Sequence, residues 1–340
     1  MTNQFIYTLA IESSCDDTSA AVLLNDKVLS NIVARQPIHE EYGGVVPELA
    51  SRAHQQNIVP VVDVALKKAG ITKNDLSCIA FTQGPGLMGS LLVGGSFAKS
   101  MSAALQIPLI AVNHMKAHIL SHFIDEEGFE KPTFPFLALT ISGGHTQIVK
   151  VSSFFDLEII GETTDDAVGE AFDKSAKVLG FKYPGGPLID KFAQEGNPKA
   201  FQFTKPKVEG LNFSFSGLKT QILYFIQKNV ALNPNFIEEN KADICASIQY
   251  TIIAILIDKL KMAVKETGIE LIAIGGGVSA NSGIRKTLKE AEILYGWKTY
   301  IPKFEYTTDN AAMIGIVGYY NFLEQNFSSA DITSKARIEF

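Results

Sequence analysis

The sequence predicts a duplicated α/β fold in which two halves, each of mixed strands and helices, enclose a cleft. Three observations support this prediction: the length of 340 residues, an apolar–polar–apolar pattern that occurs in both halves, and glycine-rich loops directly after apolar runs. A chain of this length exceeds the usual size of a single hydrophobic core. With 46% hydrophobic and 19% charged residues, the composition is that of an ordinary globular protein.

The repeated pattern indicates two β-hairpins. Residues 7–11 and 19–24 form apolar runs around a small polar loop at 12–18, and residues 136–141 and 147–151 flank Ser142–Thr146 in the same way. Short apolar runs around a loop of small polar residues are typical of hairpins. Because each hairpin opens a longer run of alternating strand and helix patterns, the sequence indicates a duplicated domain.

The remaining elements follow from apolar spacing and from turn residues. Further strands are expected at residues 78–83, 109–113 and 271–274, and helices at 51–69, 90–105, 115–123, 168–179, 241–267 and 310–325. Residues 183–187 are predicted to form a turn, because two glycines between prolines cannot continue a helix. We expect the last helix to cross back onto the first half.

Composition also limits the classes of function. The polar start at residues 1–7 does not resemble a signal peptide, and no run of about 18 apolar residues indicates a membrane span. Three widely spaced cysteines form no disulfide framework, so a cytoplasmic location is expected. A net charge of −6 is unusual for a protein that holds nucleic acid by itself, which normally displays a basic face.

Three loops have the composition of a nucleotide-binding cleft. Ser142–Thr146 and Gly275–Asn281 are rich in glycine, which lets backbone N–H groups turn toward an anion, and residues 12–18 form the third loop. No Gly-Lys-Ser/Thr follows the glycines, so this is not a P-loop. For the first loop alone, a plain hairpin turn remains the alternative.

Two histidines are candidate metal ligands. His114 and His118 are four residues apart, so a helix would place both imidazoles on one face within reach of one ion. Two structural histidines at a helix start remain the alternative. A zinc peptidase would need a glutamate directly after the first histidine, where this chain has Met115. Asp309 is the candidate third ligand, although it lies where it could instead cap a helix.

An acidic segment forms a further candidate site. Asp166, Glu170 and Asp173 fall at helical spacing, and the repulsion of like charges on one face is usually compensated by something cationic or by a hydroxyl-rich ligand. A solvated acidic face is the alternative.

The motifs together resemble the tRNA N6-adenosine threonylcarbamoyltransferase family. The resemblance covers nearly the whole chain in order; it includes residues 12–18, 43–52, 99–119, 142–146 and 165–187 and the loops at Gly275 and Asp309. It implies an actin-like, sugar-kinase-type fold of two ribonuclease-H-like lobes around a nucleotide cleft. One lobe would comprise residues 1–112 and about 315–340, and a C-terminal lobe, residues 113–314, would carry the metal and most substrate-binding residues.

The resemblance also implies the reaction and its residues. Threonylcarbamoyl-AMP would donate its threonylcarbamoyl group to N6 of adenosine 37 in tRNAs that read codons beginning with A. The implied metal ligands are His114, His118 and Asp309, holding Fe²⁺ or Zn²⁺. In the mechanism that we expect from the residues and the resemblance together, the two histidines and Asp16 are the catalytic residues. The implied substrate-binding residues are Thr140, Ile141, Ser142, Gly143, Gly144, Asp173, Gly186, Asp190 and Asn281.

Two partners follow from the same resemblance: a shortened, inactive relative of the same fold and a small P-loop ATPase. No membrane partner is expected. An actin-like ATPase or a sugar kinase is the main alternative, because these proteins share the loops but do not require paired histidines. A non-catalytic scaffold is the other alternative, and the histidine pair argues against it.

Overall fold

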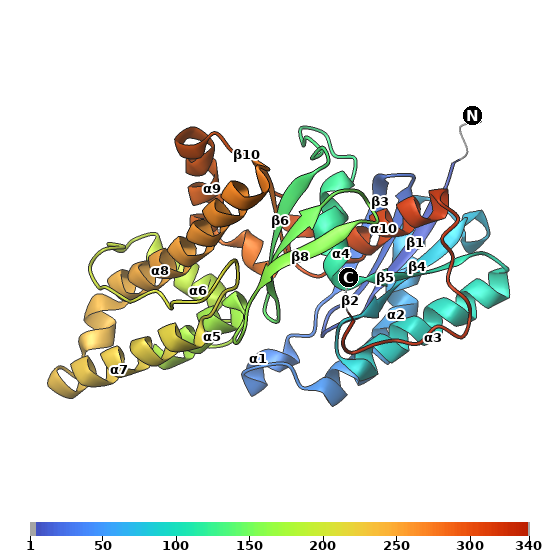
Figure 1. The fold of residues 1–340 in the computed structure, drawn as a ribbon. Coiled ribbons are helices and arrows are strands. Elements are labelled where there is room, and N and C mark those ends of the chain that lie inside the picture. The colour runs from blue at the N-terminus through green and yellow to red at the C-terminus, as the bar shows by residue number, and fades with distance from the viewer. Residues whose placement is uncertain (1–4, 339–340) are drawn as a thin grey trace. The chain divides into compact units, whose positions relative to one another are not determined.

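The computed structural model describes residues 5–338, so residues 1–4 of the polar start lie outside the described part of the chain. The chain divides into two compact units (Figure 1). Unit 1 comprises Met1–Lys131 and Pro302–Phe340, and unit 2 comprises Pro132–Ile301. This division differs from the expected boundaries at 112 and 314, and it places His114, His118 and Asp309 together in unit 1 rather than in the C-terminal lobe.

Unit 1 is built on a five-stranded mixed sheet in the order β3-β2-β1-β4-β5. The strands are β1 (Tyr7–Glu12), β2 (Thr18–Leu24), β3 (Lys27–Ala34), β4 (Cys78–Gly84) and β5 (Leu109–Asn113). β1 pairs antiparallel with β2 and parallel with β4, and β4 pairs parallel with β5. The first predicted hairpin is therefore the centre of this sheet.

Helices cover both faces of the sheet in unit 1. Leu9 and Ile11 of β1 pack in one core cluster with residues of α2 (Pro47–Ala69) and α3 (Met88–Leu105). Side chains alternate along a strand, so Ala10 points to the opposite face. There α10 (Ala311–Leu323) packs closely, because a Cβ on Gly315 would lie 3.2 Å from the Cβ of Ala10. The expectation that the last helix returns to the first half is confirmed. Unit 1 also contains α1 (Ile38–Tyr42) and α4 (His114–Leu120).

Unit 2 repeats the plan of unit 1. Its sheet has the order β10-β9-β6-β7-β8, which matches β5-β4-β1-β2-β3 in chain order and in strand direction. The strands are β6 (Phe136–Ile141), β7 (Thr146–Val151), β8 (Leu157–Glu162), β9 (Leu271–Gly275) and β10 (Lys298–Tyr300). The helices are α5 (Val168–Val178), α6 (Gly186–Ala193), α7 (Ser216–Leu232), α8 (Phe236–Thr267) and α9 (Ser282–Tyr295). The predicted duplication is confirmed.

Short 3-10 turns complete the two units, at Lys73–Asp75, Ser121–Phe123, Gly277–Ala280 and Phe304–Tyr306. Within residues 5–338, no helix combines the length and the apolar character that a bilayer crossing needs. The predicted turn at 183–187 is shorter than expected, because Gly185 is the N-cap of α6 and Gly186 is the first residue of that helix.

Candidate metal centre and substrate loops

The paired histidines lie at the start of α4, directly after β5. The side chain of Asn113 caps this helix by accepting hydrogen bonds from the backbone N–H groups of Met115 (2.8 Å) and Lys116 (3.1 Å). His114 and His118 then lie one turn apart on the same side, with ring centroids 4.7 Å apart. Both are buried.

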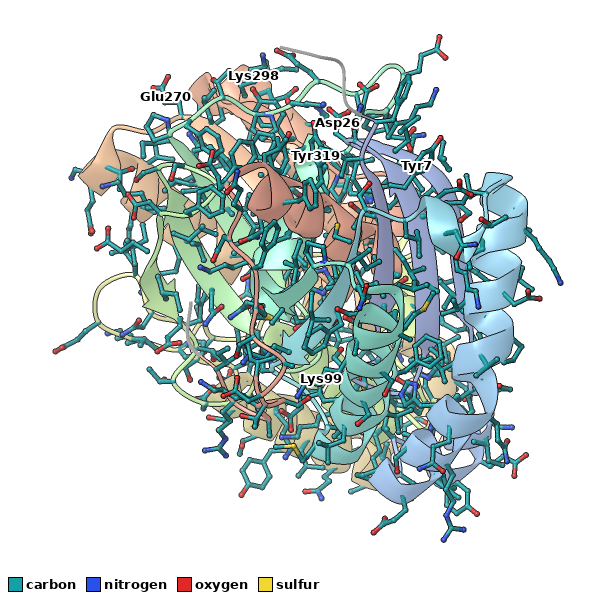
Figure 2. The ribbon with its side chains drawn as sticks, turned by 90° about the vertical axis from the view of Figure 1, so that its right-hand side faces the viewer. Tyr7, Asp26, Lys99, Glu270, Lys298 and Tyr319 are labelled. Carbon is teal, nitrogen blue, oxygen red and sulfur yellow. The ribbon has the colours of Figure 1, made fainter. Side chains whose placement is uncertain are left out.

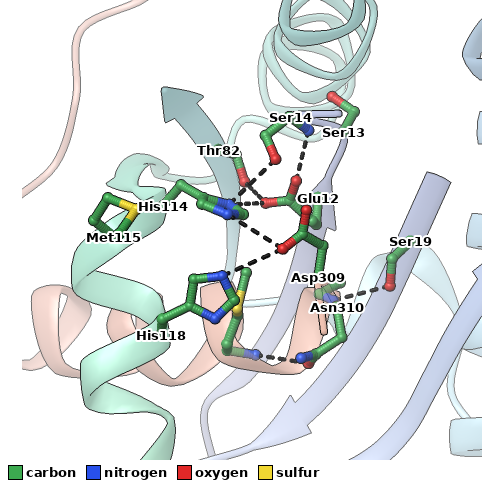
Figure 3. Close-up of polar contacts among 12 residues, drawn as sticks. Glu12, Ser13, Ser14, Ser19, Thr82, His114, Met115, His118, Asp309 and Asn310 are labelled. Atoms are coloured by element: carbon green, nitrogen blue, oxygen red, sulfur yellow. Dashed lines mark hydrogen bonds and ion pairs between the residues drawn. The ribbon is translucent and has the colours of Figure 1, made fainter. Parts of the chain in front are cut away.

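Asp309 joins the two histidines from the C-terminal segment of unit 1, which begins at Pro302. Its Oδ1 atom lies 3.3 Å from Nε2 of His114 and 3.2 Å from Nε2 of His118 (Figure 3). The expected competitor, helix capping by Asp309, does not occur: Asn310 caps α10 by accepting from the N–H of Met313 at 3.2 Å. The carboxylate of Asp309 is therefore available as a ligand.

The geometry of this cluster fits a metal ion. Ligands about 2.1 Å from a tetrahedral metal lie roughly 3.4 Å from one another, which is close to the 3.3 Å and 3.2 Å observed. His118 is fully buried, and among the described residues neither of its ring nitrogens has a partner in hydrogen-bond geometry. The 3.2 Å contact of Nε2 with Asp309 meets only the distance of an ion pair. A buried polar atom without a partner is costly, and a metal ion would satisfy Nε2 of His118.

Glu12 completes the centre by orienting His114. The Oε2 atom of Glu12, at the end of β1, lies 3.0 Å from Nδ1 of His114, and Thr82 donates to the same carboxylate. An ionised carboxylate only accepts, so Nδ1 of His114 carries a proton, and Nε2 is the atom that would offer its lone pair to a metal once its own proton is displaced. Sequence reasoning placed Glu12 in a nucleotide loop and missed this contact.

Electrostatics couple these groups. Burial acts to lower the pKa of His114, but the charges of Glu12 and Asp309 outweigh it and raise this pKa well above its usual value. The same attraction lowers the pKa of Asp309 against the effect of burial. Burial lowers the pKa of His118. A cation of higher charge can therefore replace the proton on His114 at a site that already favours positive charge.

Asp16 lies near this centre in sequence, in the loop between β1 and β2. It is partly buried, and its negative charge contributes to raising the pKa values of Cys15 and Asp17. The β1–β2 loop thus carries concentrated negative charge beside the metal ligands.

The predicted substrate loops gather at one edge of the sheet in unit 2. Thr140 and Ile141 end β6, and Ser142, Gly143 and Gly144 form the turn to β7. Two further glycines touch this turn: a Cβ on Gly169 of α5 would lie 2.7 Å from the carbonyl oxygen of Ser142, and one on Gly276 would lie 2.5 Å from that of Ile141. Apart from the adjoining residues of the loop, no atom of residues 5–338 lies within 4 Å of where a Cβ of Gly143 or Gly144 would be, and both glycines are exposed.

Asp173 and Gly186 also meet in unit 2. Asp173 accepts hydrogen bonds from the N–H groups of Gly185 (2.8 Å) and Gly186 (2.9 Å), and burial raises its pKa despite these bonds. For the other two residues the compensating cation is a side chain of the protein itself, because Lys174 lies 2.7 Å from Asp166 and 2.6 Å from Glu170. One positive charge partly relieves the repulsion between these two carboxylates.

Asp190 and Asn281 meet at the start of α9. Asp190 accepts from the N–H (2.9 Å) and the hydroxyl (2.8 Å) of Ser282. Asn281 caps α9 through the N–H of Ile284 and donates to Gln249. Both side chains therefore have structural partners.

Comparison with known proteins identifies the family. The profile described as tRNA N6-adenosine threonylcarbamoyltransferase matches residues 27–316. A protein of that name from Christiangramia forsetii is 71% identical over 340 residues and covers 100% of both chains. Another from Riemerella anatipestifer is 58% identical, covering 97% of each chain. This chain belongs to the tRNA N6-adenosine threonylcarbamoyltransferase family. The predicted activity, transfer of a threonylcarbamoyl group to N6 of an adenosine in tRNA, is confirmed.

Solved structures support the fold. HypF from T. kodakarensis has a TM-score of 0.64 at 16% identity, covering 96% of this chain and 49% of its own. A ROK hexokinase from Thermus thermophilus has a TM-score of 0.50 at 16% identity, covering 94% and 100%. These likenesses confirm the actin-like, sugar-kinase-type fold. At this identity they do not favour a kinase over the transferase that the family membership shows.

Proposed function

We propose that this transferase uses threonylcarbamoyl-AMP as donor and modifies adenosine 37 in tRNAs that read codons beginning with A. The observation that carries the metal part of the proposal is the convergence of His114, His118 and Asp309, with Nε2 of the buried His118 3.2 Å from Asp309 but out of hydrogen-bond geometry. We propose Fe²⁺ as the ion, with Zn²⁺ as the alternative, since imidazole suits both. A bound ion would act as a Lewis acid and a template for the threonylcarbamoyl group.

The residues of this chain have separate roles in the proposal. Glu12 keeps the proton of His114 on Nδ1, so that Nε2 remains a ligand. The open backbone of Gly143 and Gly144 receives the phosphate of the adenylate, and Asp173 orients its polar groups. Thr140, Ile141, Ser142 and Gly186 shape this binding site, and Asp190 and Asn281 hold it in place.

The chemical step is an acyl transfer. The N6 amine of adenosine attacks the carbamoyl carbon, the bond from that carbon to the phosphate oxygen breaks, and AMP leaves. Asp16 accepts the proton that the amine loses. The target base must be outside its stack, which an anticodon-loop nucleotide permits at low cost.

We propose that partners supply part of the tRNA surface. Basic and acidic residues balance in unit 2, so the excess negative charge of the chain belongs to unit 1. A surface of this charge repels phosphate. A shortened, inactive relative of the same fold and a small P-loop ATPase are the proposed partners, and the tRNA substrate favours a cytoplasmic location.

Replacing His118 tests the metal role. His118→Ala removes a ligand without disturbing the Asn113 cap, and we expect loss of bound metal and at least a 100-fold loss of transfer. His122→Ala is the matched control, because His122 lies one turn further along and outside the ligand cluster. Metal content would be measured by elemental analysis, and the modified nucleoside by mass spectrometry after incubation with threonylcarbamoyl-AMP, unmodified tRNA and the partners. Full activity of a metal-free His118→Ala protein would refute the metal role.

A further inference from the structure

Two chain segments supply the metal ligands of unit 1. His114 and His118 lie on the segment that runs through α4 and the 3-10 turn Ser121–Phe123 to Lys131. Asp309 lies on the segment that begins at Pro302 and leads through the 3-10 turn Phe304–Tyr306 into α10. The metal centre requires these two segments to keep a fixed separation.

The same two segments are joined a second time, away from the ligands. Glu126 lies on the histidine segment and accepts a hydrogen bond from the hydroxyl of Tyr306 at 2.5 Å through Oε1. Its other oxygen, Oε2, pairs with Lys303. Tyr306 is buried, and Lys303 also lies over the ring of Phe129, 5.4 Å from its centroid. The carboxylate of Glu126 thus binds two donors of the Asp309 segment, Tyr306 and Lys303, and we call this contact the junction.

The junction lies between Asp309 and the point where the chain enters from unit 2. On its C-terminal side, Asp309 is followed by the Asn310 cap and by Ala311, whose N–H donates to Ser19 at 2.9 Å. On its N-terminal side, the chain continues through Pro302 into unit 2. Tyr306 and Lys303 are the residues between that boundary and Asp309 that bind Glu126, so motion of the chain at Pro302 is restrained before it reaches the ligand.

We propose that Glu126 is a positioning residue for the metal centre, which holds the Asp309 segment at the distance from His114 and His118 that metal binding requires. The inference rests on the proposed metal role of these three residues. Tyr306 is a lasting donor in this arrangement, because burial and the neighbouring Glu126 raise the pKa of its hydroxyl. Groups that orient metal ligands without touching the ion affect affinity by roughly 10- to 100-fold.

The test measures metal affinity rather than activity. Zn²⁺ dissociation constants would be obtained by competition with a chromophoric chelator, on full-length protein freed of metal. We expect Glu126→Ala to weaken Zn²⁺ binding by roughly 10-fold, near the lower end of that range, because Glu126 acts through the backbone. Tyr306→Phe, which removes one hydroxyl, should weaken binding by a smaller factor. In the Glu126→Ala background it should add nothing, because its partner is already absent.

The ion pair between Lys131 and Asp26 provides a matched control. Lys131 pairs with Asp26 at 2.7 Å, and these side chains are 32% and 33% exposed, against 29% for Lys303 and 21% for Glu126. Figure 2 shows Asp26 at the turn between β2 and β3. Asp26→Ala removes a comparable ion pair and leaves the contacts of Glu126 with Lys303 and Tyr306 in place, so Zn²⁺ affinity should be unchanged.

The outcomes separate the two proposals. If the wild-type chain binds no Zn²⁺, the metal role itself fails. If the wild type binds Zn²⁺ and Glu126→Ala binds it equally well, or if Asp26→Ala weakens binding as much, the positioning role of Glu126 is refuted. Thermal unfolding of the metal-free variants shows whether each is folded, and Tyr306→Phe keeps the test decisive if Glu126→Ala does not fold.

Discussion

A single methyl group at Gly169 should disturb the substrate loop of unit 2. Gly169 is the second residue of α5, and a Cβ there would lie 2.7 Å from the carbonyl oxygen of Ser142 and 2.8 Å from Cα of Gly143. These are backbone atoms, so no side-chain rotation relieves the overlap. The N–H of Gly169 also donates to the carbonyl of Ser142 at 3.1 Å, which holds the loop against the helix.

The expected free-energy change combines two opposite terms. Alanine is favoured over glycine within a helix by about 1 kcal/mol, and by less in the first turn. Forcing a methyl group into close-packed surroundings costs about 1–3 kcal/mol. Gly169→Ala should therefore destabilise the protein by about 1 kcal/mol. Because displacement of a binding loop by about 1 Å can cost 100-fold in rate, the effect on catalysis should exceed the effect on stability.

Gly217 provides the control. It is the second residue of α7, as Gly169 is of α5, but a Cβ there would meet only one atom within 4 Å, Cγ of Pro206 at 3.9 Å. Gly217→Ala should thus stabilise the protein by up to about 1 kcal/mol. Urea unfolding would give the two free energies, and steady-state kinetics the KM for threonylcarbamoyl-AMP, which should rise at least 10-fold in Gly169→Ala. The reasoning is refuted if both variants unfold alike and bind the adenylate alike.

Further substitutions test two partly buried carboxylates, Asp17 and Asp173. Burial and the charge of Asp16 raise the pKa of Asp17 to about 6, so ionising Asp17 costs stability as pH rises toward and through that value. Asp17→Asn keeps an oxygen that accepts from the N–H of Gln36. It should stabilise the protein by about 1 kcal/mol at pH 7.5, after allowance for solvent screening, but hardly at pH 4. Unfolding measurements in which this gain in stability shrinks as pH rises would contradict the prediction. Asp173→Ala leaves the N–H groups of Gly185 and Gly186 without their acceptor and should destabilise unit 2 by about 1–3 kcal/mol. Asp173→Asn keeps that oxygen, so a raised KM with preserved stability would support direct substrate contact, and an unchanged KM would count against it.

The sequence predicted features that depend on local spacing. The hairpins appear as expected, since apolar runs around small polar residues specify β1–β2 and β6–β7 without reference to the rest of the chain. The four-residue spacing of His114 and His118 likewise specified their common face. Other elements were not assigned, among them the strands β3, β8 and β10 and the helices α6 and α7. β3, β8 and β10 are edge strands that pair on one side only, so their apolar pattern is weaker.

The helix α7 was missed although its pattern is present. Leu218, Ile222 and Ile226 recur at four-residue spacing and are all buried. The helix starts without a side-chain cap from its own N-cap residue, Phe215. Asp165, distant in sequence, accepts instead from the N–H groups of Phe215 and Ser216. A start fixed by a residue so far away is invisible to local pattern reading.

The role of Glu12 could not be predicted because it depends on strand pairing. β1, β4 and β5 run parallel, so their C-terminal ends meet at one edge of the sheet. This pairing brings Glu12 to Thr82 and to His114, which directly follows β5. Parallel partners are set by crossover connections, which spacing along the sequence does not reveal.

The candidate metal ligands differ from the other candidate residues in how their side chains are used. At each helix that carries or follows a ligand, a neighbouring asparagine makes the cap: Asn113 does so before His114, and Asn310 after Asp309. The candidate ligand atoms therefore take no part in capping these helices and can face a metal ion. Asp190 and Asn281 differ, because both oxygens of Asp190 and both polar atoms of Asn281 are already used at the start of α9. Substitutions there should act first through the position of α9 and its preceding glycine loop, whereas substitutions at the metal ligands should act through the ion.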